Sequence, residues 1–177
     1  IFMNISGKKI IIFGGTSGIG AATTKFMSEK GAAEIISISR NPDKMTNIPE
    51  NVTLKKLDVL DEETLKTFFK NQGKFDVLIN CAGYTKSNNT TQYNFNDWVK
   101  TMNVNLNSIF ILSKLVSINM IKNNISGSII NISSIGGYKG FPNNPAYTAS
   151  KAALSNLTKS MAIDLGEFNI RVNNLVP

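Results

Sequence analysis

The chain has 177 residues, of which 42% are hydrophobic and 18% are charged, and its formal net charge is +7. This length and composition are those of one soluble domain with a substantial core, and they exclude disordered and fibrous proteins. The positive charge would suit an anionic partner, but the lysines are dispersed, so a solvated basic surface is favoured over a nucleic-acid module. We find neither a secretory leader nor an apolar stretch long enough to span a bilayer. We therefore expect one domain over residues 1–177, in the cytoplasm and away from membranes.

The residue types that the chain lacks narrow its chemistry. It has a single cysteine, Cys81, and no histidine. An intramolecular disulfide, a thiolate zinc cluster, a Ser-His-acid triad and imidazole metal sites are therefore excluded, and we expect no metal. Any acid-base catalyst must be a tyrosine, lysine, aspartate or glutamate.

Strand-like and helix-like segments alternate along the chain, which predicts an α/β fold whose sheet is covered by helices on both faces. The apolar segments that read as strands are residues 8–13, 34–39, 52–59, 76–79, 127–132 and 170–176. Helical patterns lie between them, reaching Met27 after the first strand and then covering residues 61–70, 96–122 and the segment from Tyr147 to Leu165. This order predicts a doubly wound Rossmann fold with a mostly parallel sheet, six strands of which are visible.

The two longest predicted helices carry apolar stripes at helical spacing. The first stripe consists of Trp98, Met102, Leu106, Ile109, Phe110 and Leu112. The second consists of Leu154, Leu157, Met161 and Leu165.

A glycine-rich loop follows the first predicted strand and precedes a helix. Gly14, Gly18 and Gly20 stand in the spacing GxxxGxG. In a strand-turn-helix unit such glycines let the backbone approach a pyrophosphate, and the helix N-terminus then faces the phosphates. The loop indicates a dinucleotide site, although a purely structural turn would show the same pattern.

The end of the second predicted strand bears on the choice of cofactor. Sites for a free ribose 2′-hydroxyl place Asp or Glu about twenty residues after the glycines, whereas sites for a 2′-phosphate place a basic residue there. Arg40 lies twenty residues after Gly20, and its neighbour Ser39 is uncharged. The pattern predicts NADP(H) over NAD(H), with a surface arginine at a strand end as the alternative.

Tyr147 and Lys151 stand four residues apart in a predicted helix, which stacks their side chains on one face. A nearby ammonium favours the anionic form of a phenol and lowers its pKa of about 10 by roughly one to three units. Tyr147 would then exchange protons near neutral pH. The same spacing also arises on solvated helix faces, so the pair gains meaning only beside the glycine loop.

Together these marks resemble the short-chain dehydrogenase/reductase family over essentially the whole chain, and within it the 3-oxoacyl-carrier-protein reductases. The resemblance rests on four features that occur in order: the glycine loop, the run Asn80-Cys81-Ala82-Gly83, Ser134, and the pair Tyr147 and Lys151. It implies hydride transfer between a nicotinamide and a carbonyl or alcohol carbon. It also implies a small-molecule substrate and a homodimer or homotetramer in which the apolar helix stripes meet a second subunit.

Site roles follow from the same resemblance. It implies that Tyr147 is the acid in reduction, that Lys151 lowers its pKa and binds the nicotinamide ribose, and that Ser134 polarises the substrate carbonyl, with Ser133 as the fallback. Asn105 matches the asparagine that holds a water in the proton relay, although a satisfied interior amide is the alternative. The implied cofactor contacts are Gly14, Thr16, Ser17, Gly18, Ile19, Gly20, Arg40, Asp58, Val59, Asn80, Ala82, Gly83, Tyr147 and Lys151.

The sequence departs from the family pattern in a few places. Phe13 stands where threonine is common, and Cys81 replaces a frequent asparagine. The family continues past Pro177 with a lid over the substrate and a seventh strand. We expect these to lie outside this sequence, and a naturally truncated chain is the alternative. Met3 would make a natural start, with the two residues before it as an extension.

Three functions remain open at this point. The leading hypothesis is an NADP(H)-dependent oxidoreductase with a Ser-Tyr-Lys-Asn catalytic set. The alternative is a non-catalytic NADP-binding regulatory or assembly subunit. A third is a binding module for nucleic acid or an acidic carrier, which only the basic surface favours.

Overall fold

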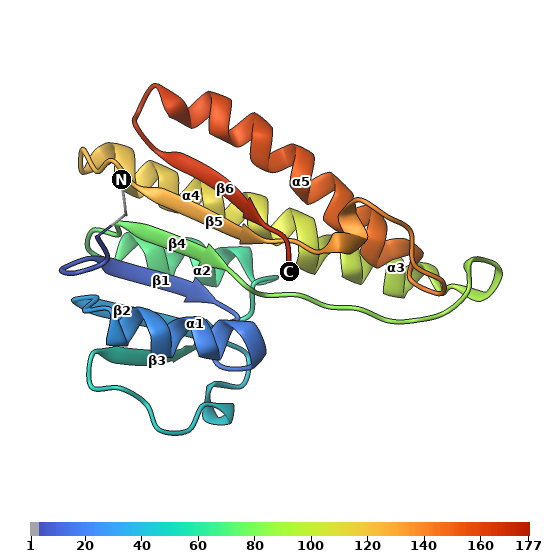
Figure 1. Cartoon of the computed structure of the whole chain (residues 1–177), viewed down its shortest axis with the longest axis horizontal. Helices are drawn as coiled ribbons and strands as arrows, with labels where there is room; N and C mark the ends of the chain where they lie inside the picture. Colours follow the sequence, from blue (N-terminus) through green and yellow to red (C-terminus); the bar gives the residue numbers. More distant parts are fainter. Residues whose placement is uncertain (1–3) are drawn as a thin grey trace.

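The computed structural model describes residues 4–177, so the start expected at Met3 lies outside the described residues. Its centre is a six-stranded sheet in the order β3-β2-β1-β4-β5-β6, in which all neighbouring strands are parallel (Figure 1). The predicted doubly wound α/β fold is confirmed. The strands are β1 (Lys9–Phe13), β2 (Glu34–Ser39), β3 (Val52–Lys56), β4 (Val77–Asn80), β5 (Ser128–Ile132) and β6 (Arg171–Leu175).

The strands begin and end within one residue of the predicted bounds, except that β3 ends at Lys56 instead of residue 59. The amide of Leu57 still donates to the carbonyl of Ser39 at 3.1 Å, but the chain then turns. In that turn the Asp58 carboxylate accepts a hydrogen bond from the amide of Leu60 at 3.0 Å. Short 3₁₀ turns interrupt the loops at η1 (Pro42–Lys44), η2 (Thr90–Gln92) and η4 (Ile135–Gly137).

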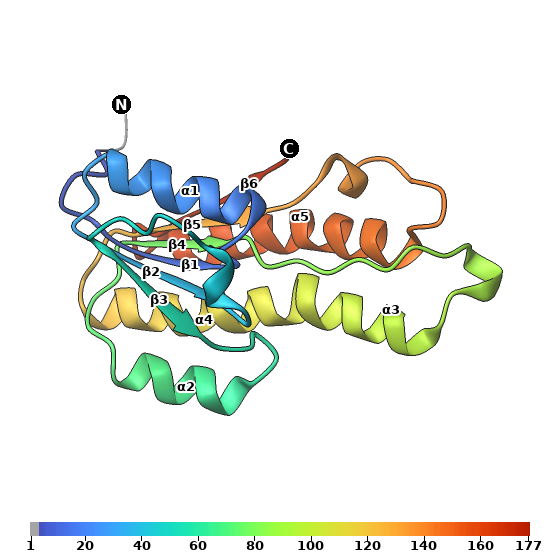
Figure 2. The ribbon, with the colours of Figure 1, turned by 90° about the horizontal axis from the view of Figure 1, so that it is seen from below.

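Helices lie on both sides of the sheet, and the direction of each crossover decides the side. Figure 2 shows α1 (Gly18–Glu29) on one side, and α2 (Glu62–Lys70) and α4 (Ser108–Lys122) on the other. The long helix α5 (Pro145–Gly166) crosses from β5 to β6 on the side of α4, because its Met161 belongs to the same buried cluster as Leu112 of α4. Within residues 4–177 no helix covers the α1 side of β5 and β6, so the expected two-sided cover is incomplete there (Figure 1).

The core is divided by the sheet into two layers, because successive strand side chains point to opposite faces. In β1 the side chains of Ile11 and Phe13 join the cluster under α2, α4 and α5, together with Leu78 and Leu112. Ile10 and Ile12 join the cluster on the α1 side. All four of these β1 side chains are fully buried, as expected of a central parallel strand.

The strand order reverses at β1, which pairs with β2 on one side and with β4 on the other. Phe13 at the end of β1 is in register with Ile38 of β2 and with Asn80 of β4. The segments that follow these three residues therefore leave the sheet side by side. Such a reversal opens a crevice at the carboxyl ends of the strands, where ligands bind in open α/β sheets.

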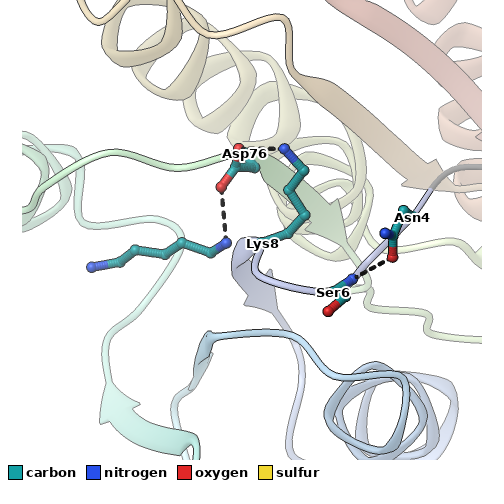
Figure 3. Close-up of polar contacts among 5 residues, drawn as sticks. Asn4, Ser6, Lys8 and Asp76 are labelled. Carbon is teal, nitrogen blue, oxygen red and sulfur yellow. Dashed lines mark hydrogen bonds and ion pairs between the residues drawn. The ribbon is translucent and has the colours of Figure 1, made fainter.

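The opposite end of β1 is fastened to β4 by Asp76 (Figure 3). One carboxylate oxygen of Asp76 accepts from the backbone amide of Lys9 at 2.9 Å, and the other lies 3.2 Å from the Lys8 amine. The nearby amide of Ser6 donates to the Asn4 side chain at 2.9 Å. Asp76 thus fixes the register of the two central strands from the end remote from the crevice.

The long helix predicted at residues 96–122 contains a change of winding. It consists of α3 (Phe95–Met102), a π-helical turn η3 (Asn103–Asn107) and α4. Within the predicted apolar stripe, Ile109 and Leu112 are buried in the core, whereas Phe110 is 48% exposed. The reason is geometric: the buried positions of α4 recur every three or four residues from Ile109, and its immediate neighbour points about 100° away from them.

The continuous helix over residues 95–122 also corrects a sequence expectation. It has 28 residues, and its most apolar window has a mean hydropathy of 1.4. By length and composition alone, this helix is long and apolar enough to cross a membrane. Half of that window is buried inside the protein. This is the pattern of a helix packed against a core, and by itself it is weak evidence for a membrane span.

Candidate active site

A cavity of about 370 Å³ opens in the crevice beyond the carboxyl ends of β1, β2 and β4. The glycine turn, the segments after β2 and β3, and the run after β4 form its wall. The predicted cofactor-binding residues all lie on this wall except Asn80, Tyr147 and Lys151. The wall consists of residues 14, 16–20, 38–41, 44, 57–59, 81–83, 104 and 132.

The glycine turn brings bare backbone to the cavity. At Gly14 a Cβ atom would lie 2.6 Å from the amide nitrogen of Ala82, and at Gly20 it would collide with the carbonyl oxygen of Gly14. Gly18 has a φ of +50° and faces open space. Helix α1 begins at Gly18, and the Ser17 side chain makes no capping hydrogen bond, so the first amides of the helix keep their donors free. These features fit the pyrophosphate of a dinucleotide.

Asn80 lies beneath the wall rather than on it. Its side chain is 1% exposed, and its Nδ2 donates to Oδ1 of Asn131 at 2.8 Å. Asn131 in turn donates to the Thr158 hydroxyl of α5 at 2.9 Å. Asn80 therefore ties the end of β4 to β5 and α5, and its side chain does not line the cavity.

Tyr147 and Lys151 lie on successive turns of α5. Lys151 is 4% exposed, and its Nζ atom donates a hydrogen bond to the carbonyl oxygen of Ile132 at 2.7 Å. The same Nζ atom lies 5.8 Å from the centre of the Tyr147 ring. Because Ile132 lines the cavity, the pair adjoins the crevice that the glycine turn forms.

Burial changes the acidity of the groups around Lys151. It lowers the pKa of Lys151 to about 8. It also raises the pKa of Cys81 to about 11, so the thiol stays protonated. No carboxylate of residues 4–177 forms an ion pair with Lys151. An amine with a pKa of about 8 can gain and lose its proton within the range that suits a proton relay.

The structure distinguishes the two candidate serines. Ser133 is 4% exposed, and its hydroxyl donates to the carbonyl of Lys151 at 3.2 Å, so it fastens β5 to α5. Ser134 is partly exposed, and its Oγ accepts a hydrogen bond from the amide of Gly136 at 3.1 Å. The hydroxyl hydrogen of Ser134 remains available to a ligand, which favours Ser134 over the fallback.

Asn105 lies in the π-helical turn and is fully buried. Its Oδ1 accepts from the amide of Tyr84 at 2.8 Å, and its Nδ2 donates to the carbonyl of Tyr84 at 2.9 Å and to the Ser150 hydroxyl at 3.0 Å. Both side-chain donors are in use. The side chain holds the segment after β4 against α5, as a satisfied interior amide does.

A family model described as short chain dehydrogenase matches residues 8–177. The chain belongs to this family. It is similar to the 3-oxoacyl-[acyl-carrier-protein] reductase of Thermotoga maritima, with 37% identity over 99% of this chain and 75% of the relative. It is also similar to carbonyl reductase [NADPH] 2 of Sus scrofa, with 32% identity over 99% and 72%.

Solved structures agree with this assignment. A structure of 4-hydroxyisoleucine dehydrogenase complexed with NADH has a TM-score of 0.89 and 34% identity, covering 96% of this chain and 74% of that one. A gluconate 5-dehydrogenase from Burkholderia cenocepacia, in complex with NADP and tartrate, has a TM-score of 0.88 and 29% identity, with coverages of 97% and 71%. This short-chain dehydrogenase is thus an oxidoreductase of the type that acts on CH–OH and C=O groups, on the branch of the 3-oxoacyl-carrier-protein reductases.

The sequence reasoning missed several wall residues of this dehydrogenase. Lys44 lies in a polar Asn-Pro-Asp-Lys turn and lines the cavity. The only feature of the sequence that could have indicated this position is that Lys44 follows Arg40 by four residues. Cys81, which the sequence marked only as a departure from the family pattern, also lines the cavity. Val104 and Ile132 also line it. No local pattern marks a cavity wall, because its members come from separate segments.

Replacing Lys151 by Met should stabilise the protein at pH 7 by about 2 kcal/mol, because the mutation removes a buried charge. The folded-state pKa of about 8 lies below the ordinary value of 10.5. The cost of the charge is therefore complete below pH 8, falls as the pH rises from 8 to 10.5, and is absent above that range. The difference in unfolding free energy between Lys151→Met and the unmodified protein should shrink over this window in urea titrations.

The exposed Lys159 of the same helix is the matched control. Lys159→Met should change the unfolding free energy by less than about 0.5 kcal/mol at either pH. A stability gain for Lys151→Met that is the same at pH 7 and pH 10 would contradict the lowered pKa of Lys151 in the folded protein.

Proposed function

We propose that this short-chain dehydrogenase is an NADP(H)-dependent enzyme that interconverts a carbonyl compound and an alcohol, with Tyr147 as its proton donor and acceptor. One observation carries the proposal: the amine of Lys151 is buried 5.8 Å from the Tyr147 ring, beside the cavity with the glycine turn. The proposal needs neither a metal nor a histidine.

The residues of the cavity suit a dinucleotide, and a nicotinamide bound there would supply or accept the hydride. The glycine turn gives the phosphates access to bare backbone and to the free amides of α1. Asp58 and Val59, in the segment after β3, line the part of the cavity proposed for the adenine.

Two hydroxyl groups are proposed to bind the substrate oxygen. The Ser134 oxygen is already an acceptor for the amide of Gly136, so its hydrogen is directed to a ligand. Tyr147 donates the second hydrogen bond and transfers its proton as negative charge grows on the oxygen. Fixed donors at a developing charge are usually the largest source of catalysis.

Lys151 is proposed to hold and return the proton of Tyr147. Its hydrogen bond to Ile132 fixes the amine. Its two remaining N–H groups have no acceptor among residues 4–177 and are proposed to bind the tyrosine and a ribose hydroxyl. Asn105 is proposed to contribute by position, because it connects the segment after Gly83 to the helix of the tyrosine.

NADP(H) is favoured by Arg40, which lies on the cavity wall and forms no ion pair with a carboxylate of residues 4–177. The relatives differ, since one solved structure holds NADH and another holds NADP. The cofactor preference therefore rests on the charge of this wall, where a 2′-phosphate would find a partner.

A second proposal concerns assembly. A groove between α4 and α5 is lined mostly by apolar side chains, among them Leu106, Phe110, Leu115 and Leu157. Phe110, which is 48% exposed, lines this groove. We propose that a second copy of the chain covers this face in a homodimer or homotetramer, because a two-fold axis would pair the apolar faces of both copies.

Tyr147→Phe should lower kcat by a factor of about 10³, because general acid catalysis contributes about 10² to 10⁴. NADP(H) affinity should stay within about twofold, since the ring is retained. Steady-state hydride transfer with a panel of ketones and fluorescence titration of NADPH would measure the two quantities. The control is Tyr138→Phe, at a tyrosine that is 64% exposed. Undiminished turnover by Tyr147→Phe would refute the mechanism.

Arg40→Asp should lower the ratio of kcat/KM for NADPH to that for NADH by about 10²-fold, because it replaces attraction of the 2′-phosphate by repulsion. Parallel assays with the two cofactors would give the ratio. A matched change on the neighbouring strand, Lys55→Asp, lies off the cavity wall and should leave the ratio within about threefold. An unaltered ratio in Arg40→Asp would count against NADP(H).

Phe110→Glu should convert the assembly to monomers at micromolar concentration, because the dimer would have to bury a carboxylate. Light scattering coupled to size-exclusion chromatography measures the mass. Ile163→Glu, on the 80% exposed far part of α5, is the control and should keep the assembly. If Phe110→Glu has the same mass as the unmodified protein, this face is not the interface.

A further inference from the structure

The wall of the cavity beside the end of β2 carries two cations. Among the described residues that line the cavity, Arg40 and Lys44 are the basic ones and Asp58 is the acidic one. We propose that Lys44 is a second specificity-determining residue, which binds the 2′-phosphate of NADP(H) together with Arg40 and the hydroxyl of Ser39. This inference rests on the proposed function and assigns the residues that read the phosphate.

Lys44 is held at the cavity rim by the turn that contains it. The η1 turn starts at Pro42, whose ring fixes the backbone angle, and the amide of Met45 donates to the carbonyl of Pro42 at 3.1 Å. Met45 is 4% exposed and anchors the turn, which packs on β2 and β3. The backbone of Lys44 is therefore fixed while its side chain remains exposed.

Ser39 supplies an oriented hydroxyl on the same wall. Its Oγ accepts a hydrogen bond from the Thr16 hydroxyl at 2.7 Å and another from the amide of Asn41 at 3.2 Å. Both acceptor positions of the oxygen are then filled, and its own hydrogen is left for a ligand. The contact with Thr16 also joins the glycine turn to the end of β2.

The two cations share this wall with a single carboxylate, that of Asp58. The ion pairs of residues 4–177 involve Lys8, Lys9 and Lys66, and neither Arg40 nor Lys44 takes part in one. Asp58 uses a carboxylate oxygen in its own turn, and Asp43 does not line the cavity.

A phosphomonoester carries a charge of about −1.5 to −2 at neutral pH, which one arginine does not balance. The glycine turn from Gly14 to Gly20 contains no charged residue, so it offers no cation for the phosphate. Lys44 is the other basic side chain on the wall among the residues described, and its flexible stem suits a point charge on phosphate.

Calorimetric titration with adenosine 2′,5′-bisphosphate and with 5′-AMP tests the inference on binding alone. Lys44→Ala should lower the affinity for the bisphosphate about tenfold, which corresponds to about 1.4 kcal/mol of binding free energy. It should change the affinity for 5′-AMP by less than twofold. Lys44→Arg should retain the bisphosphate affinity within about threefold. Lys55→Ala, which removes the same charge from β3 away from the wall, should behave like the unmodified protein.

The outcomes separate this inference from the proposed function. If Arg40→Ala lowers the affinity for the bisphosphate alone while Lys44→Ala leaves that affinity unchanged, Lys44 plays no part in binding the 2′-phosphate and the NADP(H) proposal stands. If Lys44→Ala weakens both nucleotides equally, the lysine does not read the 2′-phosphate. If the unmodified protein binds both nucleotides equally well, the NADP(H) preference itself is refuted, together with this inference.

Discussion

The amine of Lys151 lies in the interior of the protein with one carbonyl oxygen as its hydrogen-bond partner and no neutralising carboxylate among the described residues. Such burial costs stability, because the charged form loses its hydration. In return the amine lies beside the Tyr147 ring with a pKa of about 8, within the range in which protons are exchanged. The remainder of the proposed chemistry depends on this arrangement.

The sheet and its connections keep this amine in place. The amine of Lys151 donates its hydrogen bond to the carbonyl of Ile132 at the end of β5. Helix α5, which carries Lys151, is also tied to this end of β5 by the hydroxyl of Ser133. Asn105 connects the same helix to the segment after β4. Tyrosine, lysine and cavity are thereby fixed to the carboxyl ends of two neighbouring strands, which are rigid parts of the fold.

The cavity itself follows from the reversal of strand order at β1. The glycine turn leaves β1 toward α1, and the Arg40 segment leaves β2 beside it. On the other side of β1, the run after β4 approaches so closely that Gly14 has no room for a side chain next to Ala82. One end of the resulting cavity adjoins Lys151 through Ile132, and its wall elsewhere carries the cations Arg40 and Lys44. A dinucleotide has the same polarity, with the reacting ring at one end and the phosphorylated adenosine at the other.

The sequence by itself determined the features that depend on neighbours along the chain. Apolar runs and helical spacing located the six strands and the helices, the glycine loop indicated a tight turn, and four-residue spacing placed Tyr147 and Lys151 on one helix face. Tertiary structure decided the features that depend on segments far apart in the sequence. It buried Ser133 and left Ser134 accessible, and it placed hydrogen-bond partners around the Asn105 side chain. It also exposed Phe110 and brought Lys44 to the cavity. The reason is that burial and hydrogen-bond partners are set by which elements pack together, and local periodicity carries no information about the identity of those elements.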